Sequence, residues 1–167
     1  NGGTRDDTIV AGAGSSTTIN DGLIDGTMNV WDGATFNING GITGPGITAR
    51  NEARVNITAG FFGDGLFGDD DAIVTIFGDE FTVDGVPIAD LNNIGDTMAA
   101  LASPGQVYTG TLTDGTSFAL TRTEGDRFTS GAMLNFTLAN VPAVTPGTIN
   151  LPTDAVPRGL RKGQSLV

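Results

Sequence analysis

Side chains of the same type recur every 19 residues along the first half of the chain. One column of this repeat contains isoleucine four times, and the column two places earlier contains threonine, phenylalanine and two valines. These columns are Ile19, Ile38, Ile57 and Ile76, and Thr17, Phe36, Val55 and Val74. Columns of alanine and of glycine keep the same spacing. A fixed period of about 20 residues indicates a small unit stacked on copies of itself, because one such unit cannot bury an apolar face alone.

Each copy contains a stretch in which apolar and polar side chains alternate. In residues 53–58, for example, Ala53, Val55 and Ile57 fall on one face and polar residues fall on the other. Such alternation predicts a strand, and the glycine-rich and aspartate-rich stretches between strands predict corners. We therefore expect an all-β fold in which residues 1–80 form a short parallel β-helix with 19-residue coils. Right-handed coils are expected, because parallel crossovers are nearly always right-handed.

The 19-residue period ends after Ile76. Residues 81–140 predict a small antiparallel β cap, with a hairpin turn at the Asp-Gly pair 114–115 and a strand over 132–138. Residues 89–103 could hold a short helical turn. Residues 141–167 contain four prolines and predict an extended C-terminal arm.

The repeat register also connects the two ends of the sequence. Counting back 19 residues from Ile19 gives a position that Val167 would occupy if Asn1 followed the C-terminus. We therefore predict that the C-terminal segment completes the first coil of the next unit, either within a covalent tandem protein or by strand addition between subunits. A frayed end of a monomer is the alternative. The residues expected at this junction are Leu160, Ser165, Leu166, Val167, Asn1, Gly2, Gly3 and Ile9.

Composition restricts the partners of the chain. The formal net charge of −11 makes nucleic acid and anionic membranes poor partners. No apolar run reaches the roughly 20 residues of a membrane span. The chain opens at Asn1 without a signal peptide, so we expect a mature or excised piece. Its richness in Gly, Thr, Asn and Asp, with no Cys, favours a bacterial extracellular or cell-surface protein. A basic cluster in the arm indicates either an electrostatic contact with the acidic body or a solvated linker; it contains Arg158, Arg161 and Lys162.

The stretch 55–63, Val-Asn-Ile-Thr-Ala-Gly-Phe-Phe-Gly, resembles the repeat of secreted bacterial β-helix surface proteins, of a style common in planctomycetes. The stretches 81–88, 110–116 and 151–166 resemble the segments that follow and lead into such repeats. This resemblance implies an extracellular structural or adhesive role, and it carries over no catalytic residue.

Site chemistry is sparse in the sequence. Asp69, Asp70 and Asp71 supply the oxygen ligands that calcium prefers, although an acidic corner that faces water is the favoured explanation. Asn56 and Asn135 stand in Asn-x-Thr sequons and are candidate glycosylation sites. Outward threonines raise the possibility of ice binding, but asparagine and arginine interrupt their columns.

We expect a non-enzymatic extracellular structural protein that forms head-to-tail fibres, with no catalytic residues and no cofactor apart from possible calcium. The alternative from a different class is a monomeric carbohydrate- or calcium-binding adhesin module, with a surface polysaccharide as its partner. Size in solution distinguishes the two.

Overall fold

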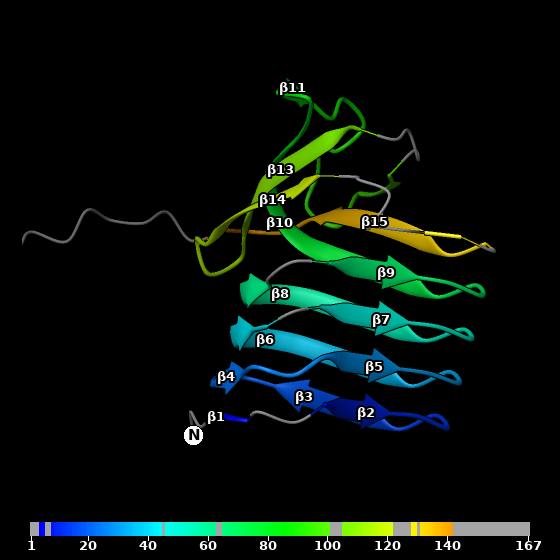
Figure 1. Ribbon diagram of the computed structural model, residues 1–167. Helices are drawn as coiled ribbons and strands as arrows, with labels where there is room; N and C mark the ends of the chain where they lie inside the picture. The colour runs from blue at the N-terminus through cyan, green and yellow to red at the C-terminus, as the bar shows by residue number, and fades with distance from the viewer. Residues whose placement is uncertain are drawn as a thin grey trace, which may run out of the picture.

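The computed structural model is a rod of stacked β-coils with a smaller β layer on one end (Figure 1). It describes residues 4–5, 8–44, 46–62, 65–100, 105–121, 128–129 and 131–141. These residues form fifteen strands and no helix. The all-β parallel solenoid predicted from the sequence is therefore confirmed.

Ten strands build the coils, and they fall into two parallel sheets that face each other across the core. They are β1 (Thr4–Arg5), β2 (Ile9–Ala11), β3 (Ser16–Ile19), β4 (Leu23–Ile24), β5 (Met28–Val30), β6 (Thr35–Thr43), β7 (Ile47–Ala49), β8 (Arg54–Phe62), β9 (Leu66–Gly68) and β10 (Ile73–Val83). Strands β2, β5, β7 and β9 form a four-stranded sheet, and the others belong to an eleven-stranded sheet.

The pairing register between coils is 19 residues, as the sequence predicts. Ile19 lies beside Ile38, Ile38 beside Ile57, and Ile57 beside Ile76. Phe36, Val55 and Val74 form the neighbouring column in the same way. All of these side chains are buried except Ile19, which lies in the first coil and packs against the core only partly buried.

Polar side chains form a second set of columns on the outside of the eleven-stranded sheet. Asn56 Nδ2 donates a hydrogen bond to Asn37 Oδ1 at 2.9 Å. In the adjacent column, Asn39 Nδ2 donates to Asn20 Oδ1 at 3.1 Å, and Thr58 Oγ1 donates to Asn39 Oδ1 at 3.0 Å. Each outward amide therefore connects one coil to the next.

Several positions in each coil have a left-handed backbone. At the corner after the four-stranded sheet, Asp32, Asn51 and Asp70 have φ values of 55°, 53° and 50°, a conformation that Asn and Asp adopt more readily than other side chains. Inside the long strands, Gly41 and Gly60 have φ values of 89° and 94°. These glycines stack closely, since a Cβ on Gly60 would lie 2.5 Å from the carbonyl oxygen of Gly41.

A fifth coil forms after a long excursion of the chain. Strand β15 (Met133–Leu138) pairs in parallel with β10, and it places Leu134 beside Val74 and Phe136 beside Ile76. Phe128 bridges in parallel to Gly68 and so extends the four-stranded sheet. Each β10–β15 pair is 60 residues apart in sequence, so the 19-residue spacing does not reveal this coil.

The antiparallel cap expected over residues 81–140 is present in part, but the strand expected over 132–138 is β15, which belongs to the parallel rod and not to the cap. The cap contains β11 (Val86–Pro87), β12 (Thr97–Ala99), β13 (Val107–Leu112) and β14 (Ser117–Thr121). The second half of β10 pairs with β13, the hairpin of β13 and β14 turns at the predicted Asp-Gly pair, and β12 lies antiparallel to β15. Phe136 joins the two parts, with its ring centroid 5.1 Å from Phe81 and 5.3 Å from Tyr108.

The prediction of a short helical turn within 89–103 is wrong over the described residues up to 100, because these residues form bends, turns and β12. The carboxylate of Asp96 accepts hydrogen bonds from the backbone N–H groups of Asn92 and Asn93, at 3.0 and 2.7 Å. Such side-chain to backbone bonds compete with helix formation. The N–H groups of Asn93 and Asn92 also hold the pKa of Asp96 below its usual value.

Candidate functional site

The lower end of the rod has an open strand edge. In the described part of the chain, β3 pairs with β6 on one side and has no strand on the other. The neighbouring segment β4 does have a strand below it, because β1 pairs with it in the 19-residue register. Ile19 is half-buried, whereas Ile38 directly above it is 1% exposed. Among the described residues, the lower edge of β3 is therefore unpaired, and Ile19 at the end of the isoleucine column is only half-buried.

The upper end of the rod is built differently, because antiparallel strands cover its edge. Strand β12 lies along the outer edge of β15, and the hairpin of β13 and β14 lies along the second half of β10. Phe81, Tyr108 and Leu112 fill the space above the fifth coil and are buried. The two ends therefore differ in what they offer to a partner strand.

The tip of the β13–β14 hairpin is fastened to the third coil. The backbone N–H of Thr113 donates to Thr58 O at 2.9 Å, and the N–H of Gly60 donates to Asp114 Oδ2 at 2.8 Å. Burial alone would raise the pKa of Asp114, but the backbone N–H groups of Thr116 and Gly60 outweigh it and hold this pKa below its usual value. Asp114 is thus a charged anchor for the cap.

Of the residues predicted at the junction between units, the structure describes Ile9. It lies in β2, pairs with Met28 in the 19-residue register, and is half-buried at the edge of the four-stranded sheet. The other predicted junction residues lie outside the described residues; they are Asn1, Gly2, Gly3, Leu160, Ser165, Leu166 and Val167.

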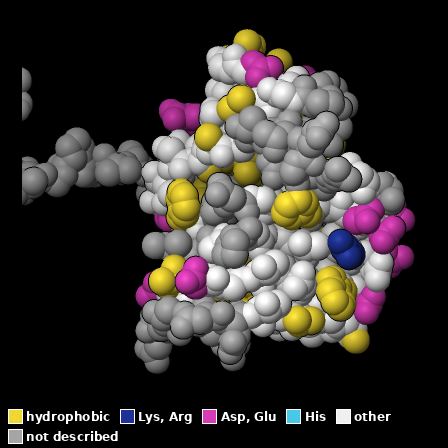
Figure 2. All heavy atoms as spheres, viewed as in Figure 1, with side chains coloured by type: hydrophobic (Ala, Val, Ile, Leu, Met, Phe, Trp, Pro, Cys, Tyr) yellow, Lys and Arg dark blue, Asp and Glu magenta, His cyan; other side chains and the backbone are white. Residues whose placement is uncertain are grey.

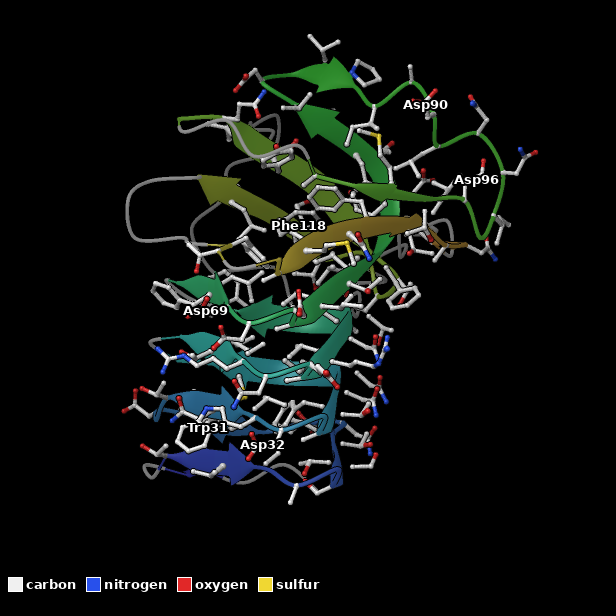
Figure 3. The ribbon with its side chains drawn as sticks, turned by 90° about the vertical axis from the view of Figure 1, so that its right-hand side faces the viewer. Trp31, Asp32, Asp69, Asp90, Asp96 and Phe118 are labelled. Carbon is white, nitrogen blue, oxygen red and sulfur yellow. The ribbon has the colours of Figure 1, made fainter. Side chains whose placement is uncertain are left out.

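The three aspartates proposed as calcium ligands lie at the corner between β9 and β10, where Figure 3 labels Asp69. Asp69 Oδ1 accepts hydrogen bonds from Asp70 N at 3.0 Å and Thr129 Oγ1 at 2.7 Å, so this carboxylate ties the corner to the next coil. Asp70 and Asp71 are exposed. Within the described ranges, no three acidic side chains are grouped so that they could hold a metal ion. Calcium binding stays a prediction.

Both predicted glycosylation sites lie in one outward column of the eleven-stranded sheet. Thr75 pairs with Asn56 on one side and with Asn135 on the other. Asn56 is half-buried, and its Nδ2, the atom that would carry a glycan, donates the hydrogen bond to Asn37. A glycan on Asn56 would therefore break a rung of the asparagine column.

The outward face of the four-stranded sheet carries a feature that the sequence analysis did not identify. Figure 2 shows hydrophobic side chains above and below one Lys or Arg side chain on this face, with Asp and Glu along the adjacent edge. The residues are Val10 and Trp31, which are exposed, Phe67, which is half-buried, and Arg50, which is exposed. The 19-residue register places Trp31, Arg50 and Phe67 on successive coils of this surface.

Across the described residues, no helix is long and apolar enough to pass through a membrane. No protein-family model, curated protein or solved structure matches the chain.

Proposed function

We propose that this is an extracellular structural protein that assembles head to tail, with the C-terminal segment of one copy adding a strand to the first coil of the next. The observation that carries the proposal is the edge of β3, which pairs with no strand of the described residues on its lower side, although β1 fills the corresponding place beside β4. An exposed strand edge is a template for strand addition, and its backbone groups supply the hydrogen bonds.

The repeat register selects the donor residues. Continuing the 19-residue spacing places Gln164–Val167 beside Ser16–Ile19, with Val167 next to Ile19. Val167 would then cover the half-buried end of the isoleucine column, and Leu166 would face outward beside Thr18. The donor and acceptor surfaces are different parts of the chain, so the contact does not close on itself and produces an open filament.

Two forms of this assembly use the same contact. The next copy is either a separate subunit or the following repeat of a longer tandem chain. A denaturing gel of the native material separates them, because only the non-covalent form gives a band at 17.0 kDa. The proposed role is mechanical, because stacked hydrogen-bonded strands and buried apolar columns resist unfolding. It involves no catalytic chemistry.

The test compares the full chain with Val167→Asp and its matched control Leu166→Asp, by light scattering after gel filtration and by electron microscopy. We expect filaments for the full chain, mostly monomers for Val167→Asp because a charge would enter the apolar column, and filaments for Leu166→Asp. Ile19→Asp should repeat the effect from the acceptor side. A full chain that stays monomeric at high concentration would refute the proposal, and so would equal effects of the two tail variants.

The competing function is a monomeric carbohydrate- or calcium-binding adhesin at the bacterial cell surface. It predicts a discrete particle of 17.0 kDa in every variant. Of these two ligands, carbohydrate and calcium, a surface polysaccharide is the one that a specific surface of this rod favours.

A further inference from the structure

We propose that the outward face of the four-stranded sheet binds a neutral, extended polysaccharide, with Trp31 and Phe67 as stacking surfaces and Arg50 between them. This inference does not depend on head-to-tail assembly, because the open edge and this face are formed by different residues.

The first argument is the orientation of the aromatic rings. Trp31 follows β5 and is 39% exposed, although a large aromatic side chain is usually placed where it gains more burial (Figure 3). The ring of Phe67 lies back along β9 over Gly65, since a Cβ on Gly65 would lie 2.6 Å from Phe67 Cε2. Phe67 is half-buried, so part of its ring remains exposed and could stack against the C–H face of a sugar.

The spacing between Trp31 and Phe67 suits an extended glycan. Trp31 and Phe67 belong to coils that are two apart, because β7 lies between β5 and β9. The strand spacing places their coils about 10 Å apart along the rod. An extended β-linked glycan presents the same sugar face at every second unit, which is a similar length. Phe67 stacks on Thr48 and Asn29, two residues along the strand from the column of Trp31 and Arg50, so the two aromatic positions are also about 7 Å apart across the rod. A glycan that contacts both rings would therefore run obliquely across the coils, over roughly 12 Å, with Arg50 beside it.

The third argument is the set of polar groups around the rings. A shallow hollow of about 370 Å³ is lined by Thr48, Arg50, Phe67, Asp69 and Thr129, together with backbone. Arg50 supplies donors and Asp69 supplies acceptors. The 2.7 Å hydrogen bond from Thr129 Oγ1 to Asp69 Oδ1 holds both groups at the rim of the hollow. Hydroxyl groups, which donate and accept, match such a mixed set better than a purely apolar ligand does.

The negative charge of the protein favours a neutral glycan over an acidic one. The chain carries a net charge of −11, and Asp and Glu line the edge beside this face. Of the side chains that the structure describes, Arg50 and Arg54 are the only cationic ones, and Arg50 alone lies at the hollow. One cation on an acidic surface does not hold a polyanion, whereas a neutral chain is not repelled.

The chain supplies its own probe, because Trp31 is its single tryptophan. We would titrate the full chain with hydroxyethylcellulose, galactomannan and, as the acidic comparison, polygalacturonate, and follow the fluorescence of Trp31 together with retardation in gels that contain each polymer. At least one neutral polymer should shift the emission to shorter wavelength and retard the protein, while polygalacturonate should do neither.

The variants locate the site. Phe67→Ala should weaken binding about tenfold while keeping the fluorescent reporter, and Trp31→Ala should abolish most of the gel retardation. Trp31→Phe should restore part of it, whereas Val86→Ala and Ile94→Ala, which remove exposed apolar side chains elsewhere, should change nothing. Circular dichroism confirms that each variant is folded.

Three results would overturn the proposal. One is the absence of a response to both neutral polymers in the full chain. Another is binding of polygalacturonate alone, which would indicate an acidic ligand. The third is a change of oligomeric state in Trp31→Ala without a change in polymer binding, which would assign this face to lateral contact between copies.

Discussion

Phe136 should be among the most stabilising residues of the chain if β15 completes a fifth coil. It lies beside Ile76 at the end of the isoleucine column and is 0% exposed. Its ring contacts Phe81 and Tyr108, with centroids 5.1 and 5.3 Å away. Phe136→Ala removes these contacts and leaves a cavity between the coils and the cap. Truncation of a buried phenylalanine costs about 3–5 kcal/mol, and this enclosed site belongs at about 4 kcal/mol.

Thermal and urea unfolding, followed by far-ultraviolet circular dichroism, measure this loss. For a chain of this length, about 4 kcal/mol lowers Tm by roughly 8–16 °C. The matched control is Met133→Ala, on the same strand but with its side chain 43% exposed, where the cost should stay near 1 kcal/mol or less. A loss for Phe136→Ala no larger than for Met133→Ala would show that β15 does not continue the apolar column.

Amide exchange adds a test of location. Each coil of a solenoid contacts only its neighbours, so the destabilisation should remain near the altered coil. Protection in Phe136→Ala should fall in β12 and β15, which pair with each other, and should remain in β6 and β8. Uniform loss of protection would refute this local account.

Three further predictions concern the devices that hold the coils in register. Gly41→Ala should cost at least 1 kcal/mol more than Gly33→Ala in urea unfolding, because both residues have positive φ but only at Gly41 would a Cβ meet backbone, 2.7 Å from Gly22 O. Asp114→Asn should flatten the acid limb of a stability–pH curve. The folded-state pKa of Asp114 lies below the ordinary 3.8, so its carboxylate stabilises the fold above that pH, and this stabilisation is lost as pH falls through the folded-state pKa. Asn56→Ala should cost about 1 kcal/mol in the same unfolding assay through the lost bond to Asn37.

The sequence predicts the first four coils well because their geometry is strictly periodic. Stacked coils must place like side chains above one another, so Ile38 and Ile57 are both neighbours in space and matches at a spacing of 19. The corner residues follow the same logic. Asp32, Asn51 and Asp70 share one left-handed position, and the sequence shows this as a column of Asp and Asn.

The 19-residue period does not predict the fifth coil, because the chain leaves the rod before it returns to form that coil. The matched stretches are 72–76 and 132–136, which share alanine at the first position and apolar residues at the third and fifth. Their separation of 60 residues is not a multiple of 19, so no column predicts it. Comparison of the sequence with itself at every offset could have found the match. The pairing of Gly68 with Phe128 supports it, because the small residue leaves room for the large ring in the next coil.

The sequence did not predict the surface formed by Trp31, Arg50 and Phe67, for a different reason. A single tryptophan in the sequence indicates nothing about a surface, and Arg50 and Phe67 are 19 and 36 residues further along. The short strands β5, β7 and β9 bring them together, and their three-residue lengths show too little alternation to separate inward from outward positions.

The difference between the two ends of the rod also limits how copies can join. If both ends were bare coils, one body could stack directly on the next and bury each apolar column end to end. Here β12 and the β13–β14 hairpin cover the upper edge, so a bare coil has no matching surface to meet there. At the lower end, β1 already occupies the place below β4, so the open edges among the described residues are those of the short strands β1, β2 and β3. A joining element must therefore be a short extended segment, and a peptide of residues 160–167 added in excess should compete with it and shorten any filament that the full chain forms.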